Sequence, residues 1–283
     1  MADWKIETTD LKQRGYSWSE VAAEIQPFFP DLDRQQVLEK VRGHIRRTNK
    51  TIKAVGKNKI ILVIGDTHFP FEHPNYLEFL KQTAKEYKVT DIVHIGDMCD
   101  NSAISRHQTE TCAMDATTEY QKALECVQRY AKVFPKLKYV LGNHSLIPLR
   151  QCATMGIPKE FIKGTSELWN FPQEWEVAER YIIDNVLYEH GIGYGGKNGA
   201  LDKANNSMMS CVIGHSHAFG GCQYKSNSEK LIFGLNAGAG VDISAYAFNY
   251  GKFSKNRETL GCGIVLNQSK AIFVPMGLEF FRN

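Results

Sequence analysis

The chain has 283 residues and a formal net charge of +3, and its 43% hydrophobic and 23% charged content is that of a globular protein with one large domain and a small appendage. Its longest aliphatic run, residues 60–64, is too short to span a bilayer, and no signal peptide is evident near Met1, so we expect neither a membrane protein nor a secreted one. The seven cysteines, an odd number without a C-x-x-C pair, argue against disulfides and a zinc ribbon and indicate a cytoplasmic protein with reduced thiols.

Residues 1–50 are predicted to form a small all-α unit. Ser17 and Glu20 make a capping box at the start of a first helix, which ends near Pro27. Asp33 caps a second helix that reaches about residue 47, with apolar residues at helical spacing: Val37, Leu38, Val41 and Ile45. Residues 7–14 are a candidate for a third helix. Short helices joined by tight turns fit a helix-turn-helix unit.

The charge of the segment that follows is lopsided, because residues 40–59 contain eight lysines and arginines and no acidic residue. This is the charge pattern expected of contacts to a phosphate backbone, so nucleic acid is the predicted partner. The candidate contacts are Arg42, Arg46, Arg47, Lys50 and Lys53. Residues 51–58 are expected to form a basic linker to the next unit. The alternative interpretation of the charge is a solvated helix face and this linker, without nucleic-acid binding. Oligomeric state is not indicated by the sequence.

From residue 59 onward, predicted strands and helices alternate. Strands are expected at residues 60–64, 91–95 and 138–141, with helices at 75–87 and 115–134 between them. This alternation is typical of a parallel sheet flanked by helices. The later part is richer in strands, expected at 186–189, 211–213, 231–235, 262–266 and 271–274. We therefore expect residues 59–283 to form one α/β domain.

Oxygen and imidazole donors gather in five short blocks, each placed directly after a predicted strand. The blocks are Gly65-Asp66-Thr67-His68, Gly96-Asp97-Met98-Cys99-Asp100, Gly142-Asn143-His144, Tyr188-Glu189-His190-Gly191 and Gly214-His215-Ser216-His217. Loops at the ends of neighbouring strands converge in an α/β sheet, so these donors are expected to lie close together. Mixed carboxylate, amide and imidazole donors suit Mn²⁺, Fe or Zn²⁺ better than Ca²⁺ or Mg²⁺.

The order D-x-H, G-D-x-x-D, G-N-H, H-G and G-H-x-H resembles the calcineurin-like metallophosphoesterase superfamily, from residue 59 to about residue 220. The resemblance implies a two-sheet sandwich flanked by helices, with two divalent metal ions at one end. It implies a first metal held by Asp66, His68, Asp97 and His217, and a second held by Asp97, Asn143, His190 and His215. Asp97 would bridge the two ions, for which Mn²⁺ is expected and Fe or Zn²⁺ are the alternatives. A hydroxide shared by the metals would attack phosphorus in line.

The remaining polar residues of these blocks are candidates for catalysis and substrate contact. By the resemblance, His144 contacts the scissile phosphate or protonates the leaving oxygen, and Asp100 orients it and raises its pKa. A nearby dication would lower that pKa. Many members carry an acidic residue where this chain has Ser145, which changes the surroundings of the ligands and removes none of them. Three residues near the second block are candidate substrate contacts, with an ordinary loop role as the alternative: Asn101, Arg106 and His107.

These observations predict a metal-dependent phosphodiesterase or nuclease that acts on nucleic acid. The alternatives are a phosphomonoesterase, a small-molecule (nucleotide) phosphodiesterase, and a DNA-binding regulator with a degenerate hydrolase domain. A protein phosphatase is disfavoured, since that branch reads G-D-x-V-D-R-G and G-N-H-E, and this chain has Asn101, Ser102 and Ser145 there. The complete set of donors argues against a degenerate site.

Overall fold

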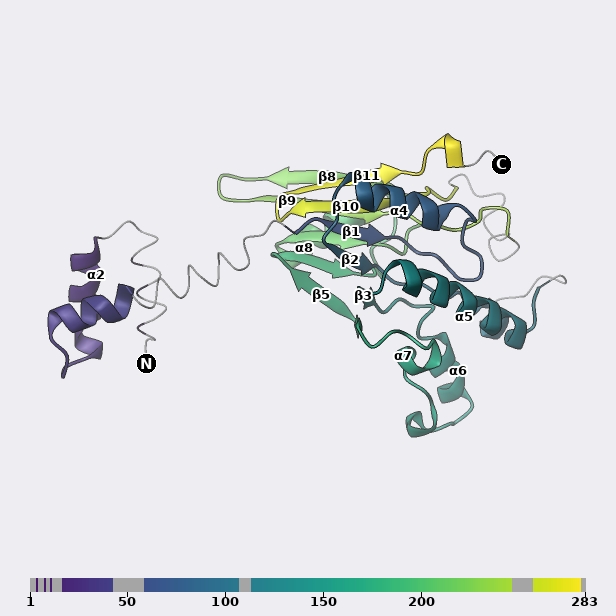
Figure 1. Cartoon of the computed structure of the whole chain (residues 1–283), viewed down its shortest axis with the longest axis horizontal. Helices are drawn as coiled ribbons and strands as arrows, with labels where there is room; N and C mark the ends of the chain where they lie inside the picture. The colour runs from purple at the N-terminus through teal and green to yellow at the C-terminus, as the bar shows by residue number, and fades with distance from the viewer. Residues whose placement is uncertain are drawn as a thin grey trace. The chain divides into compact units, whose positions relative to one another are not determined.

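A computed structural model of the chain describes residues 4, 8, 11, 17–42, 59–106, 113–245 and 257–280. The chain divides into two compact units, Met1–Asn58 and Lys59–Asn283 (Figure 1). Each unit has its own hydrophobic core.

The N-terminal unit contains two capped helices. Helix α2 (Trp18–Ile25) starts with the predicted capping box, in which Ser17 Oγ accepts from Glu20 N at 3.3 Å and Glu20 Oε2 accepts from Ser17 N at 2.7 Å. The chain continues in the 3₁₀ turn η1 (Gln26–Phe28). Asp33 and Gln36 make the same reciprocal pair before a helix described over residues 34–42. Together with Leu11, the two helices bury a shared apolar cluster: Val21, Ala22, Ile25, Val37 and Val41. The predicted end of the second helix lies outside the described residues.

The larger unit contains a six-stranded sheet in the order β11-β10-β1-β2-β3-β4. Four of its strands run parallel: β1 (Ile61–Ile64), β2 (Asp91–His94), β3 (Leu137–Val140) and β4 (Trp175–Ala178). Two antiparallel strands extend it beside β1, namely β10 (Gly261–Asn267) and β11 (Lys270–Pro275). The first three parallel strands match the predicted ones to within a residue at each end, and the predicted 262–266 and 271–274 strands are β10 and β11.

A second sheet has the order β5-β6-β7-β9-β8. Its strands are β5 (Arg180–Ile183), β6 (Val186–Glu189), β7 (Ser210–Ile213), β9 (Leu231–Ala237) and β8 (Gly220–Ser226). One apolar cluster joins the two sheets face to face, with Val63 and Val93 from the first sheet and Tyr188, Val212 and Leu235 from the second. The domain is therefore the predicted two-sheet sandwich.

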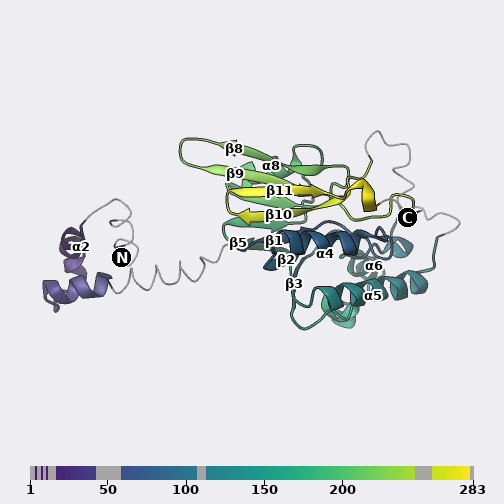
Figure 2. The same cartoon turned by 45° about the horizontal axis from the view of Figure 1, so that its top comes forward.

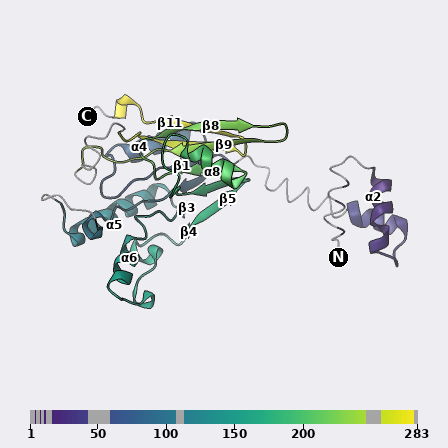
Figure 3. The ribbon, with the colours of Figure 1, turned by 180° about the vertical axis from the view of Figure 1, so that it is seen from behind.

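Helices cover the outer faces of this sandwich (Figure 2). Helices α4 (Tyr76–Glu86) and α5 (Ala116–Val133) pack on the first sheet, where Leu62 and Ile64 of β1 meet Leu80 and Val127. Helix α8 (Gly199–Ser207) packs on the second sheet through Ala200 and Ala204 (Figure 3). Since successive side chains of β1 point alternately to the helices and to the other sheet, the strand is buried on both faces, which explains its continuous apolar sequence.

Several elements of the larger unit were not expected from the sequence. Strands β4, β5 and β8 and helix α8 are additional, as are two helices that follow the third block, α6 (Ile147–Thr154) and α7 (Thr165–Leu168). Short 3₁₀ turns complete the described elements: η2 (Ser102–Ile104), η3 (Lys159–Phe161) and η5 (Leu278–Phe280). Within the described ranges, no helix is both long enough and apolar enough to cross a membrane.

Candidate metal centre

The seven predicted ligands lie in loops that follow β1, β2 and β3 of one sheet and β6 and β7 of the other. Three predicted ligands in these loops have left-handed backbone, with φ of 47° at His68, 44° at Asp97 and 65° at His215. This conformation costs a residue other than glycine about 1–3 kcal/mol and is concentrated at functional sites. Main-chain bonds hold the loops together, including His68 N to Asp97 O at 3.0 Å. The sandwich therefore brings distant parts of the sequence to one place.

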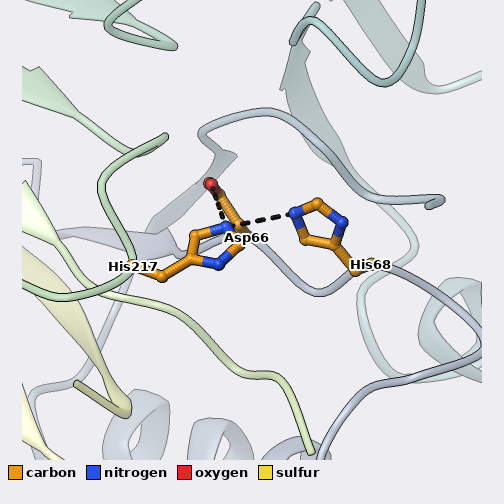
Figure 4. Close-up of side chains that lie close together, drawn as sticks. All are labelled: Asp66, His68 and His217. Atoms are coloured by element: carbon orange, nitrogen blue, oxygen red, sulfur yellow. Dashed lines mark hydrogen bonds and ion pairs between the residues drawn. The ribbon is translucent and has the colours of Figure 1, made fainter. Parts of the chain in front are cut away.

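A first donor cluster consists of Asp66, His68 and His217. Figure 4 shows a ring nitrogen of His217 directed toward a ring nitrogen of His68 and toward the carboxylate of Asp66. His217 Nε2 lies 3.1 Å from Asp66 Oδ2 and 3.1 Å from His68 Nε2. Asp66 is fully buried, and its Oδ1 has no hydrogen-bond partner among the described residues. A buried carboxylate oxygen without a donor is costly, so this cluster is suited to holding a cation.

The protonation of His68 supports the same interpretation. Burial and the nearby His144 lower the pKa of His68, which makes it neutral near pH 7, although Asp100 acts in the opposite direction. His68 Nδ1 lies 2.6 Å from Asp100 Oδ1 and donates to it, so the lone pair of Nε2 is directed toward His217. A histidine whose second nitrogen is held by a carboxylate is the usual form of a metal ligand.

A second cluster consists of Asp97, His190 and His215, with Asn143 beside it. His190 Nε2 lies 2.9 Å from Asp97 Oδ2 and 3.0 Å from Asn143 Oδ1, while its Nδ1 donates to the carbonyl of Ile95 at 3.1 Å. Burial lowers the pKa of His190, but the charges of Asp97 and Asp66 outweigh it and raise the pKa to about 9. Surroundings that stabilise a proton so strongly also favour a metal cation.

The two clusters adjoin, since His190 Nδ1 lies 3.9 Å from Asp66 Oδ1. Asp97 takes part directly only in the second cluster, and its Oδ1 accepts from the main-chain nitrogen of His144 at 2.8 Å. Its predicted bridging role stays a prediction. All seven predicted ligands are nevertheless brought together, from five loops of two sheets.

Glycines of these blocks make room for ligands from other loops. A methyl group on Gly96 would overlap with His190, one on Gly142 with Asp97, and one on Gly214 with Asp66. Each of these glycines immediately precedes a predicted ligand of its own loop. The glycine in each of these blocks is therefore a packing requirement of the site.

His144 lies at the more accessible side of the site, with 27% of its side chain exposed against 3% for His68. Its Nδ1 lies 2.5 Å from the main-chain oxygen of Asp100 and 3.3 Å from the carboxylate Oδ1. Burial lowers the pKa of His144, but the hydrogen bond to Asp100 and the charge of Asp97 raise it to about 9. Asp100 thus contacts His144, and its orienting role stays a prediction. It also holds His68, which the sequence did not indicate.

The predicted substrate contacts have partners within the protein. Asn101 is buried and its Nδ2 donates to the carbonyl of His144 at 3.1 Å, while Arg106 is exposed and donates to Thr154 Oγ1 at 2.6 Å. Arg42 lies over the ring of Trp18, at 5.7 Å from its centroid. The remaining candidates lie outside the described residues: Arg46, Arg47, Lys50, Lys53 and His107. Contacts of all these residues with substrate stay predictions.

Two residues that the sequence did not single out as a pair connect the second and third blocks. Tyr139 of β3 is buried, and its hydroxyl lies 2.6 Å from Ser145 Oγ and accepts from Met98 N at 3.3 Å. Ser145 Oγ also accepts from Gly142 N at 3.2 Å. The sequence already showed that Ser145 replaces the usual acidic residue, so it could have drawn attention to this position. Its hydrogen-bond partner Tyr139 could be identified only from the fold.

The family model of the calcineurin-like phosphoesterases matches residues 60–232, more than half of the sequence. The chain belongs to the calcineurin-like phosphoesterase family. No curated protein matches it at a significant level.

Similar solved structures include vacuolar protein sorting 29 proteins from three organisms. The one from Cryptosporidium parvum has 14% identity and a TM-score of 0.38, and the match covers 77% of this chain and 96% of that one. A single mutant of Vps29 from Entamoeba histolytica has 14% identity and a TM-score of 0.36 over 77% and 99% of the two chains. Vps29 from Chaetomium thermophilum has 13% identity and a TM-score of 0.34 over 73% and 82%. With TM-scores below 0.5, these similarities say nothing about function.

Proposed function

We propose that the protein is a phosphodiesterase that uses two divalent metal ions and acts on nucleic acid. The observation that carries the proposal is the meeting of the two donor clusters, Asp66, His68 and His217 with Asp97, His190 and His215. The family membership supports phosphoester chemistry at this place.

The donor set fits two transition-metal ions. The first would be held by Asp66, His68 and His217, and the second by Asp97, Asn143, His190 and His215, with Asp97 predicted to contact both. Imidazole nitrogens mixed with carboxylate and amide oxygens favour Mn²⁺, with Fe or Zn²⁺ as alternatives. When bound, such a pair of ions polarises the phosphoryl oxygens and activates a water molecule for attack.

Residues of the chain itself would handle the leaving group. Asp100 and Asp97 raise the pKa of His144 to about 9 against the effect of burial, which favours its protonated form. It is therefore able to donate a proton to the leaving oxygen. Asp100 and Asn101 keep it in place, through the contacts of Asp100 with Nδ1 and the hydrogen bond from Asn101 to the main-chain oxygen.

Nucleic acid is the proposed substrate because of the basic segment that precedes the hydrolase unit. Residues 40–59 carry eight positive side chains and no negative one. Such a segment attracts a polyanion and would raise its concentration near the metal centre.

An activity panel tests this proposal. Purified protein should hydrolyse bis(p-nitrophenyl) phosphate and single- or double-stranded DNA with Mn²⁺, and lose this activity with EDTA. Hydrolysis of p-nitrophenyl phosphate alone, with every diester inert, would favour a phosphomonoesterase. Binding of DNA without hydrolysis and without bound metal would favour a regulator with a degenerate site.

A further inference from the structure

Residues of helices α5, α6 and α7 line a small cavity. Figure 1 shows where these three helices lie. The volume of the cavity is about 120 Å³, and its lining includes Asn101, Ile104, Glu119, Tyr120, Pro148 and Trp169. Nothing in the chemistry described above uses it. Its lining joins residues from four parts of the chain, so only the folded domain creates it.

Residues that line the cavity also contact or adjoin residues of the metal centre. Asn101 follows Asp100 directly, and its side chain donates to the carbonyl of His144 at 3.1 Å. Pro148 belongs to the first turn of α6, the helix that begins shortly after His144. A group held in the cavity would therefore contact Asn101, the residue that holds the main chain of His144.

Glu119 is the polar group of this cavity with capacity for a ligand. The residue is 4% exposed, and its Oε2 accepts from Ser102 Oγ at 2.8 Å and from Ala103 N at 2.9 Å. Its Oε1 accepts no hydrogen bond from any residue that the structure describes. Since Oε1 accepts no hydrogen bond from the described residues, Glu119 can accept one from a ligand that brings an N–H group.

The walls of the cavity are suited to a flat aromatic ring. The rings of Tyr120 and Trp169 lie 5.2 Å apart at 34°, and Tyr120 is held by a hydrogen bond from its hydroxyl to Leu168 O at 2.8 Å. Trp169 is 3% exposed, so its position is set by the core. Aromatic side chains of this kind stack on nucleobases. An apolar cavity of about 150 Å³ holds one benzene ring, so a cavity of about 120 Å³ can receive part of a single ring and is too small for a fused pair.

We propose that this cavity is a base-binding subsite for a pyrimidine, in which the exocyclic amine of cytosine donates to Glu119 Oε1. Cytosine fits because a carboxylate accepts from its N4 amino group. The subsite would hold the base of the nucleotide on the leaving-group side, beside His144. This assignment of the base rests on the proposed function, since only a nucleic-acid substrate brings a base there.

The first test measures binding without hydrolysis. Full-length protein is titrated with cytidine, adenosine and ribose, while the indole N–H resonance of Trp169 is followed by NMR and assigned with Trp169→Phe. These probes carry no phosphate, so their binding depends neither on metal nor on turnover. Cytidine should shift the resonance and bind at least about tenfold more tightly than adenosine. Equal binding of the two nucleosides, or no shift with either, would overturn the proposal.

The second test uses Glu119→Gln, with Glu125→Gln on the exposed side of the same helix as its control. One hydrogen bond to a charged group corresponds to about a tenfold change in affinity, so Glu119→Gln should weaken cytidine binding about tenfold. Glu125→Gln should leave it unchanged. Should Glu119→Gln unfold the domain, Tyr120→Leu provides an independent variant, because loss of stacking on the base should also cost about tenfold or more. Unchanged cytidine affinity in the folded variants would contradict the proposal.

Turnover of dinucleotides separates this subsite from the proposed function. With Mn²⁺, a dinucleotide whose leaving group is cytidine should show about tenfold lower KM than one whose leaving group is adenosine. This difference in KM should vanish in Glu119→Gln. Cleavage of both dinucleotides without preference would refute the subsite and leave the phosphodiesterase intact. Binding of cytidine through Glu119 by a protein that cleaves no diester would support the subsite and refute the proposed function.

Discussion

Asp97 uses both carboxylate oxygens to link the second donor cluster to the loop that carries Gly142-Asn143-His144. Its Oδ2 lies 2.9 Å from His190 Nε2, and its Oδ1 accepts from His144 N at 2.8 Å. One residue therefore fixes a predicted ligand and the main chain of the predicted acid. Its left-handed backbone, with φ of 44°, is held because these contacts outweigh the strain.

Asp97→Ala should remove both metal ions and all diesterase activity, because the predicted bridge and the anchor of the His144 loop are lost together. Metal content per chain, measured by inductively coupled plasma mass spectrometry, checks this. Asp202→Ala, at an exposed position of α8, is the control and should keep both ions. One ion retained in Asp97→Ala would show that Asp97 serves only the second cluster.

The hydrogen-bonded pair of Tyr139 and Ser145 supports the loops that carry Asp97 and Asn143. Tyr139→Phe leaves Ser145 Oγ and Met98 N without that hydroxyl, so the loops carrying Asp97 and Asn143 should hold their ligands less firmly. Loss of such a supporting contact typically weakens metal binding about 10–100-fold. A Mn²⁺ titration measures the effect, and Ser145→Thr, which retains a hydroxyl, should bind Mn²⁺ more tightly than Ser145→Ala. Equal Mn²⁺ affinity in all variants would assign the pair no role at the site.

At the scale of elements, β1 illustrates how packing positions the chemistry. It lies between α4 and α5 on one side and the second sheet on the other, and it ends two residues before Asp66. Its four apolar residues made it predictable from the sequence. Strands β5 and β8 were not predictable in the same way, because they carry exposed and polar residues without a clear alternation.

Leu62→Ala should lower the free energy of unfolding by about 2–5 kcal/mol, since it leaves a cavity among fully buried side chains beneath α4 and α5. Urea unfolding followed by circular dichroism measures the loss. Ile182→Ala on β5 is the control, because Ile182 is 60% exposed and its truncation should change stability by less than about 0.5 kcal/mol. Equal losses in both variants would contradict the assignment of β1 to the core.

At the scale of the whole molecule, the chain combines a small helical unit with a hydrolase-type sandwich, Met1–Asn58 and Lys59–Asn283. The first unit has its own buried cluster, and the second contains every predicted metal ligand. Under the proposed function, the basic segment attracts the substrate and the sandwich carries out the phosphoester chemistry.

Deletion of residues 1–55 should weaken DNA binding and flatten its dependence on salt, because fewer phosphate contacts release fewer counterions. Turnover of bis(p-nitrophenyl) phosphate should stay the same. Fluorescence anisotropy with labelled DNA at several salt concentrations measures the first effect. An unchanged affinity and salt slope would support the solvated helix face and basic linker as the correct interpretation of residues 40–59.

The sequence by itself determined the family, the parallel strands that carry the first three motifs, and the identity of the residues that gather at the centre. It could do so because each donor directly follows a buried strand, and a strand of this kind is recognisable from local composition. The tertiary structure alone decided which donors meet, the second role of Asp100 at His68, the Tyr139–Ser145 pair and the cavity around Glu119. These features join residues 6 to 151 positions apart in the sequence, so they depend on how strands and helices pack and on no local pattern.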